Sequence, residues 1–234
     1  MIVRPHGASL LLVTQPDHAV LAARIMDRWL TRGFPGEPRR ASILRAIAEH
    51  DSGWREVDAA PLLDEATGRV QDFISAPAQV RQNVWPRAVG RLADDPTSAA
   101  LVAEHAIQIY SRFKDDAAWG GFFAEMAVLR NEHASRAGLT AEAIERQYFF
   151  VRMGDLISLT FCAAWDEVQQ IGGHDIQLRE GGVVTIRPDP FGGSSVPFDI
   201  PARALHNGSF QSGAESADAY HNASIITLSG IARG

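Results

Sequence analysis

A histidine and an aspartate lie at the end of a predicted helix, on the side that faces the protein interior. His50 and Asp51 are adjacent and close a predicted helix over about residues 39–50, whose buried stripe includes Ile47. They follow Ile47 by three and four residues, so both lean toward the packed face. An imidazole beside a carboxylate can ligate one metal ion. On the dipeptide alone, a simpler interpretation is favoured: a histidine that complements the helix dipole, followed by an Asx turn.

Asp155 lies inside the most apolar helix that the sequence predicts, over about residues 140–170. The residues four and seven positions before and after it share its face of the helix, and all are hydrophobic: Tyr148, Val151, Leu159 and Cys162. A carboxylate on such a face is costly to bury without a partner. The sequence offers two solutions of equal weight, an ion pair with Arg152 or contact with a metal ion or a histidine.

Three further histidines fall on predicted helices. His18 begins the apolar stripe of the first helix, His105 lies on that of a later helix, and His133 follows a weaker stripe. Each alone is more simply a hydrogen-bonded core histidine than a metal ligand. Together with the residues above, and without the weaker His133, they place ligand-type side chains at inward positions of four helices. A shared polar centre is therefore an equal alternative.

The order of these residues resembles a known signature. His18, then His50-Asp51, then a distal Asp155 resembles the H…HD…D pattern of the HD-domain superfamily, whose members bind a divalent metal with these residues in a helical bundle. The sequence segments around these residues resemble a family of uncharacterised bacterial proteins more closely than they resemble the HD superfamily. The segments are 15–18, 46–54, 58–64, 154–159 and 188–191. That family brings no activity with it, so the resemblance implies a metal site without a reaction.

One position departs from the pattern of the HD hydrolases. Many of them carry a lysine in the sequence HDxGK, which helps to bind substrate phosphate, and Trp54 occupies that place here. A phosphohydrolase on this scaffold needs another cation near the site. The sequence leaves open which arginine supplies it, and the candidates nearest the motif are Arg24, Arg28, Arg45 and Arg55.

The first functional hypothesis is a metal-dependent phosphohydrolase. It uses as metal ligands His18, His50, Asp51 and Asp155. Such ligands suit Mn²⁺, Fe²⁺, Co²⁺ and Zn²⁺ alike. The ion would activate a water molecule and polarise a phosphoryl oxygen, so that a small phosphoester or nucleotide is hydrolysed. We assign catalytic roles to Asp51, which would orient the water or bridge to a second ion, and to His105, which with His133 would ligate that second ion.

Two alternatives stay open. The same residues with His105 and His133 resemble the six-ligand pattern of di-iron HD oxygenases, in which two irons activate O₂ against a C–H bond. Otherwise the polar residues are a relic hydrogen-bond network in a helical module that binds a ligand or a protein. Bound iron with an optical band favours the oxygenase, and a stable metal-free protein favours the binding module.

The amino-acid composition restricts the kinds of molecule that the protein can bind. The chain has 22 basic and 28 acidic residues and a net charge of −6, which argues against binding to a nucleic-acid backbone. Its one cysteine, Cys162, excludes an intramolecular disulfide and a cysteine-cage zinc site. No apolar run is long enough to cross a membrane and no signal peptide is evident, so we expect a cytoplasmic protein. We expect a small-molecule substrate and leave a homo-oligomer open.

The elements that must position these residues are mainly helical. We expect an HD-like helical bundle, with a first helix that begins near Pro16 and others over about 39–50, 77–93, 96–113, 117–136 and 140–170. Asp95 is the expected N-cap of the fourth helix, and Gly138 is expected to end the fifth. A short helix is expected over 213–222.

A change in composition marks a boundary. Ten of the 20 glycines fall within residues 171–234, where charged residues also become rarer. Short β-like runs lie there at 183–187, at 196–200 with 202–205, and at 225–228. We expect them to pair with an N-terminal hairpin into a small antiparallel sheet. The expected domains are therefore 1–171, a helical domain with the hairpin, and 172–234, a β-rich cap packed on it.

Overall fold

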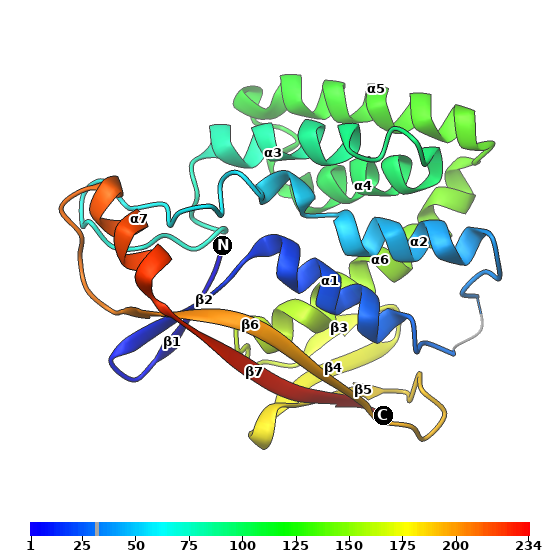
Figure 1. The fold of residues 1–234 in the computed structure, drawn as a ribbon. Coiled ribbons are helices and arrows are strands. Elements are labelled where there is room, and N and C mark those ends of the chain that lie inside the picture. The colour runs from blue at the N-terminus through cyan, green and yellow to red at the C-terminus, as the bar shows by residue number, and fades with distance from the viewer. Residues whose placement is uncertain (31–32) are drawn as a thin grey trace.

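A seven-stranded sheet curls beneath a group of helices in the computed structural model of the chain, which describes residues 1–30 and 33–234 (Figure 1). The strands run in the order β1-β2-β6-β7-β5-β4-β3. Their bounds are β1 Ile2–His6, β2 Ser9–Val13, β3 Gln169–Ile171, β4 His174–Arg179, β5 Val183–Arg187, β6 Val196–His206 and β7 Ser224–Arg233. All neighbouring strands are antiparallel except β5 and β7, which are parallel.

The expectation of a mainly α bundle with a small antiparallel sheet is wrong. The chain is 48% helical and 21% strand, and its sheet is mixed and extends across the whole base of the molecule. The expected strand over 183–187 is confirmed as β5. The expected runs 196–200 and 202–205 are a single strand, β6, which contains Pro197 and Pro201. Both prolines lie at exposed positions of an 11-residue strand whose alternate side chains are buried. β3 and β4 were not expected, and β3 falls inside the segment assigned to the long helix.

The helices have the bounds α1 Gln15–Met26, α2 Arg39–Glu49, α3 Ala78–Gly90, α4 Pro96–Ile109, α5 Gly120–Ala137, α6 Ala141–Cys162 and α7 Gly213–Asn222. The expected helix over 213–222 is confirmed as α7. The side chain of Asp95 accepts a hydrogen bond from the Ser98 amide at the start of α4, and Gly138 ends α5 in the left-handed conformation with φ 63°. Both expected helix ends are thereby confirmed.

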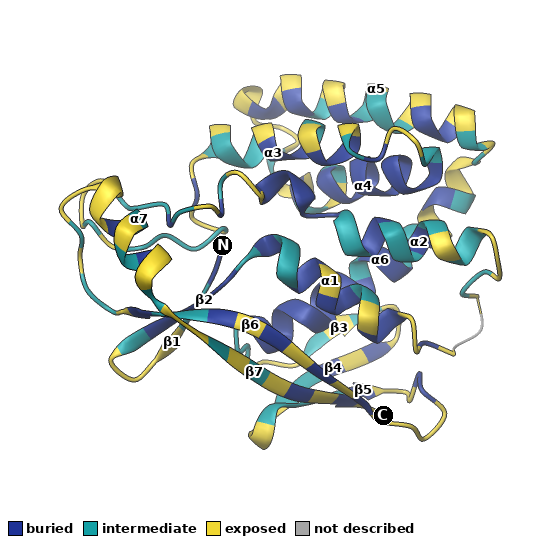
Figure 2. Cartoon of the chain, viewed as in Figure 1, coloured by how far each residue is buried: buried dark blue, intermediate teal, exposed yellow. Residues whose placement is uncertain are grey.

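Helix α6 is the centre of the packing. It contacts α1, α2 and α4 on one side and β3, β4 and β5 on the other. The C-terminal part of α6, residues 153–162, is buried, as Figure 2 shows. There Phe161 packs edge to face on Phe198 of β6, with ring centroids 4.7 Å apart. Helix α5 lies outside α4, away from the sheet (Figure 1). Three helices, α1, α2 and α4, therefore meet around α6, and α5 is not among its principal neighbours.

The two ends of the chain share the sheet. Ser9–Leu12 of β2 pairs with Arg203–His206 of β6, so the N-terminal hairpin joins the C-terminal segment directly. The division into domains at residue 171 stays a prediction. Within the described part of the chain, no helix combines the length and the apolar character that a membrane span requires.

Candidate metal centre

Five of the six proposed ligands gather in two overlapping groups. One group is His18, His50 and Asp51, and the other is His50, His105 and Asp155. Within each group the ligand atoms lie within 4.8 Å of one another. All five side chains are buried, with at most 5% of any residue exposed. His50 belongs to both groups and therefore links them.

The five ligands come from four parts of the helical layer. His18 lies on α1, whose first turn is capped by the Thr14 side chain, which accepts a hydrogen bond from the Asp17 amide. His50 caps the C-terminus of α2, and Asp51 follows it at the start of the turn Ser52–Trp54. His105 lies on α4 and Asp155 on α6. Segments distant in sequence thus meet at one buried point.

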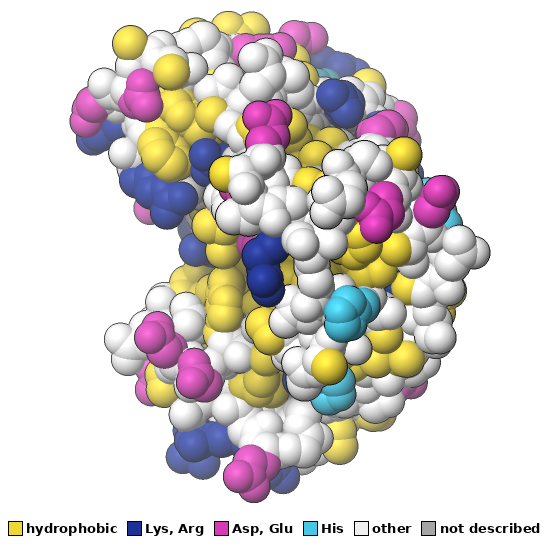
Figure 3. Space-filling model, turned by 90° about the vertical axis from the view of Figure 1, so that its left-hand side faces the viewer, with side chains coloured by type: hydrophobic (Ala, Val, Ile, Leu, Met, Phe, Trp, Pro, Cys, Tyr) yellow, Lys and Arg dark blue, Asp and Glu magenta, His cyan; other side chains and the backbone are white. Residues whose placement is uncertain are grey.

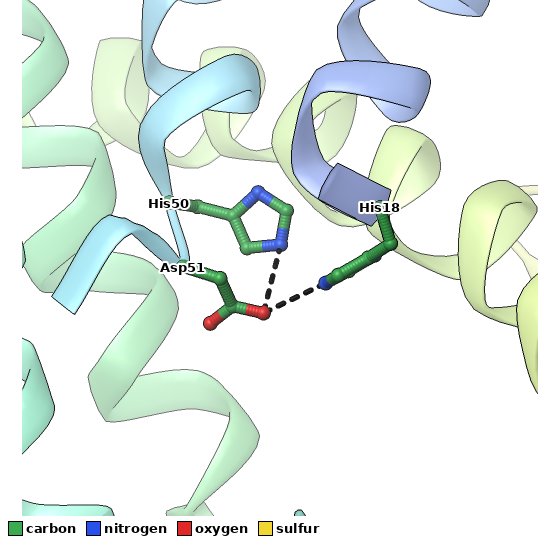
Figure 4. A group of neighbouring side chains, drawn as sticks. All are labelled: His18, His50 and Asp51. Carbon is green, nitrogen blue, oxygen red and sulfur yellow. Dashed lines mark hydrogen bonds and ion pairs between the residues drawn. The ribbon is translucent and has the colours of Figure 1, made fainter. Parts of the chain in front are cut away.

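Asp51 lies between the first two histidines, and Figure 4 shows its carboxylate facing both rings. Its Oδ2 is 2.7 Å from Nε2 of His18 and 3.5 Å from Nε2 of His50. The rings of His18 and His50 stand nearly perpendicular, with an interplanar angle of 86°. One carboxylate oxygen therefore accepts a hydrogen bond from Nε2–H of His18 and also faces Nε2 of His50.

Hydrogen bonds on the far side of each ring set its orientation. Ser158 has one hydroxyl hydrogen, which it donates to the Asp155 carbonyl, so its oxygen accepts from Nδ1 of His18 at 2.9 Å. Nδ1 of His50 donates to the Ile47 carbonyl at 2.7 Å. Nε2–H of His18 donates to Oδ2 of Asp51. A cation bound in the cluster would replace this proton, and both rings would then present the lone pair of Nε2 to it. This is the tautomer that a metal ligand held by such partners adopts.

Asp155 satisfies both of the alternatives raised by the sequence. Its Oδ2 accepts a hydrogen bond from Arg152 at 2.9 Å and lies 3.8 Å from Nε2 of His105. Its Oδ1 lies 3.6 Å from Nε2 of His50. Asp155 therefore pairs with Arg152 and at the same time faces His50 and His105.

The charges of the cluster shift its protonation. Burial lowers the pKa of His50, but the Asp51 and Asp155 carboxylates outweigh it and raise that pKa to about 9. Burial lowers the pKa of His105 to about 3. Burial would raise the pKa of Asp51 and of Asp155, yet the neighbouring His50 holds both below the ordinary range. At neutral pH a cationic His50 and a neutral His105 therefore lie beside the two carboxylates.

These residues fit a divalent transition metal. Nε2 of His50 and Nδ1 of His105 are buried and have no hydrogen-bond partner among the described residues, a costly state for polar atoms. Imidazole nitrogen with carboxylate oxygen suits several first-row metals. The buried His and Asp groups could bind a metal ion, and their chemistry does not select which one.

His133 is the proposed ligand that the structure places elsewhere. It lies on α5 and belongs to neither group, although it too is buried. Burial of the ring lowers the pKa of His133, and the guanidinium of Arg136, 3.4 Å from its Nδ1, lowers it further. A ligand role for His133 in this cluster has no support in the described structure.

A cavity of about 200 Å³ reaches the cluster. Asp51, His105 and Asp155 form part of its wall. The rest of the wall combines aromatic and aliphatic side chains with three arginines: Arg81, Arg112 and Arg152. A hollow with the same mixture of hydrophobic and basic side chains is visible in Figure 3.

The arginines of the cavity are not those nearest the motif. Arg45 pairs with Asp94 at 2.7 Å, Arg55 pairs with Glu49 at 2.9 Å, and none of the four candidates from the sequence lines the cavity. Arg81 and Arg112 were missed because they belong to no motif, although Arg112 follows His105 by only seven residues. The one local signal was the spacing of Arg81 and Trp85, which puts both on one face of α3.

Comparison with known proteins gives a family without an activity. Neither the curated proteins nor the solved structures include a match to the chain. A family model described as "Protein of unknown function (DUF3891)" matches residues 1–207. This agrees with the resemblance to an uncharacterised family, whereas a relationship to the HD-domain superfamily stays a prediction. The chain belongs to the family of proteins of unknown function DUF3891.

Proposed function

We propose that the chain is a metal-dependent phosphohydrolase that acts on a small phosphoester or nucleotide. The observation that carries this proposal is that Asp51, His105 and Asp155 belong both to the buried ligand groups and to the wall of the cavity. A small molecule in the cavity would therefore face the cation directly. Reaction sites commonly combine such a pocket with titratable groups whose pKa values are shifted.

Each residue of the cluster would have its own role in hydrolysis. His18 and His50 would hold the cation through Nε2, because Ser158 and the Ile47 carbonyl engage their Nδ1 atoms. A divalent cation in such a site polarises a phosphoryl oxygen and lowers the pKa of a water molecule. Asp51 would accept a proton from the attacking water at its carboxylate. His105 is neutral at physiological pH and would complete the wall beside Asp155.

Arginines balance the charge of the substrate. Asp51 and Asp155 alone would repel a phosphate, whereas the three arginines of the cavity wall make it attractive to an anion. They supply the positive charge that the motif lacks at Trp54. The six-ligand oxygenase hypothesis requires His133, which lies outside the cluster, so the hydrolase agrees better with the geometry.

Turnover tests the proposal directly. Chelator-treated protein would be assayed with p-nitrophenyl phosphate and nucleoside monophosphates before and after addition of Mn²⁺, Co²⁺ or Zn²⁺. We expect metal-dependent release of phosphate, and a loss of about a hundredfold or more in kcat for Asp51→Asn. Asp94→Asn is the matched control, because Asp94 is an exposed carboxylate paired with Arg45.

Absence of turnover with every metal and substrate would overturn the proposal. Equal activity of Asp51→Asn and wild type would do the same. Activity that survives complete removal of metal would assign hydrolysis to other groups.

A further inference from the structure

The side chain of Arg81, on α3, is surrounded by three aromatic rings. Its guanidinium carbon lies 5.9, 5.5 and 5.4 Å from the ring centroids of Tyr110, Phe113 and Trp119. Aromatic faces attract a cation without accepting its N–H groups in the manner of a carboxylate. The rings therefore hold the guanidinium in place and leave its donors available.

Arg81 and Arg112 have no carboxylate partner within 4.0 Å in the described part of the chain. Arg152, the third arginine of the cavity wall, is paired with Asp155. Nε of Arg81 is buried without an acceptor. An unsatisfied buried N–H is costly, and a guanidinium fork matches the oxygens of a phosphate. Arg81 and Arg112 thus form an unpaired cationic part of a cavity in an acidic protein.

A second buried donor points to the same kind of ligand. Trp54 also lines the cavity, and its indole Nε1 is buried and has no acceptor among the described residues. An indole nitrogen can only donate. Arg81 and Trp54 therefore each have a buried donor without an acceptor. An anion rich in oxygen atoms would provide such acceptors.

The remaining wall restricts the rest of the ligand. It is largely hydrophobic, with Phe73, Ile109, Leu159 and Trp165 among its members. The cavity volume of about 200 Å³ is below the range of about 300–1,000 Å³ that holds drug-sized ligands. The space inside the cavity suits one phosphate and a compact apolar group.

We propose that Arg81 and Arg112, with the indole of Trp54, bind the phosphate of a small monoester whose alcohol is compact and hydrophobic or aromatic. This inference rests on the proposed function, because it names the substrate class of the same site. It also assigns two arginines as specificity-determining residues. Neither is a metal ligand, so their effect can be measured on binding alone.

Calorimetric titration with phenylphosphonate, which cannot be hydrolysed at its P–C bond, tests the inference without turnover. Methylphosphonate and benzoate are the comparison ligands, since each has only part of the expected chemistry. The titrations use the protein as purified and again after chelator treatment. The variants are Arg81→Met and Arg112→Met, and the control is Arg146→Met, an exposed arginine on α6 that does not line the cavity.

We expect phenylphosphonate to bind at least about tenfold more tightly than either comparison ligand, and each cavity variant to weaken it about tenfold or more. Arg146→Met should bind like wild type. Because Arg112 is exposed, its variant keeps the test valid if Arg81→Met fails to fold. Equal binding of the three ligands, or of Arg112→Met and wild type, overturns the inference. If phenylphosphonate binds as expected but no phosphoester is hydrolysed, the proposed function alone fails.

Discussion

His18 and Asp51 are 33 residues apart in sequence, yet Nε2 of His18 lies 2.7 Å from Oδ2 of Asp51 in the interior of the protein. The contact joins the start of α1 to the turn that follows α2. Because Nδ1 of the same ring is directed to Ser158 on α6, one imidazole connects three segments. The geometry of the proposed metal site thus depends on packing between helices, so residues that are not ligands themselves should affect metal binding.

Ser158→Ala should weaken metal binding while the fold is retained. The change removes the acceptor that holds Nδ1–H of His18, and loss of such a partner costs about 10–100-fold in metal affinity. Competition titration with a chromophoric chelator measures the affinity. Thr160→Val is the matched control, because the Thr160 hydroxyl on the same helix donates to the Leu156 carbonyl and contacts no ligand. Equal losses in both variants would show that the effect is structural.

Metal binding should release at least one proton at neutral pH. The carboxylates raise the pKa of His50 to about 9, so the ring is protonated in the metal-free protein and must lose its proton to become a ligand. His105, with a pKa of about 3, is already neutral and releases none. Apparent affinity should therefore rise with pH, by about tenfold per unit below pH 9 for this one group.

Titration calorimetry in two buffers of different ionisation enthalpy measures the protons released. Repeating it at about pH 6 and about pH 8 gives the pH dependence of the affinity. Binding without proton release, or affinity that falls as the pH rises, would contradict the protonation assigned to His50.

Gly53→Ala should destabilise the protein and disturb the site. A Cβ at this position would collide with the backbone carbonyl of Val84, which approaches closely from α3. Backbone cannot move as readily as the end of a side chain, so we expect a loss of at least about 2 kcal/mol in the free energy of unfolding. Gly121→Ala is the control, since a Cβ there meets nothing within 4 Å and α5 gains an alanine. Urea denaturation distinguishes the two, and equal stability of both variants would show that Gly53 is not required.

Helical periodicity was sufficient to nominate most of the cluster. It placed His18, His105 and Asp155 on inward faces, and the structure brings these faces together around His50. The same argument failed for His133, because periodicity shows that a residue faces inward and not which neighbouring helix it faces. Helix α5 packs on the outside of α4, so its inward side does not reach the cluster.

The sheet and the cavity depended on long-range contacts that the sequence pattern does not show. β7 extends over Ser224–Arg233, although Gly230 interrupts its apolar pattern, because β6 and β5 hydrogen-bond along its two sides. Arg81 reaches the cavity through the packing of α3 against its neighbours, and the spacing of residues in α3 shows only that it shares a face with Trp85. Turn residues and helix caps were predictable because their causes are local.

The metal content of tag-free protein tests the central claim most directly. Mass-spectrometric element analysis should find about one or two equivalents of a divalent transition metal in the wild type, as purified or after incubation with Mn²⁺ or Fe²⁺. His50→Gln, which removes the residue shared by both ligand groups, should lose it, whereas His133→Gln should retain it. Circular dichroism would establish that both variants are folded. A wild type that stays empty after metal addition, or a His50→Gln variant with unchanged metal content, would contradict the account.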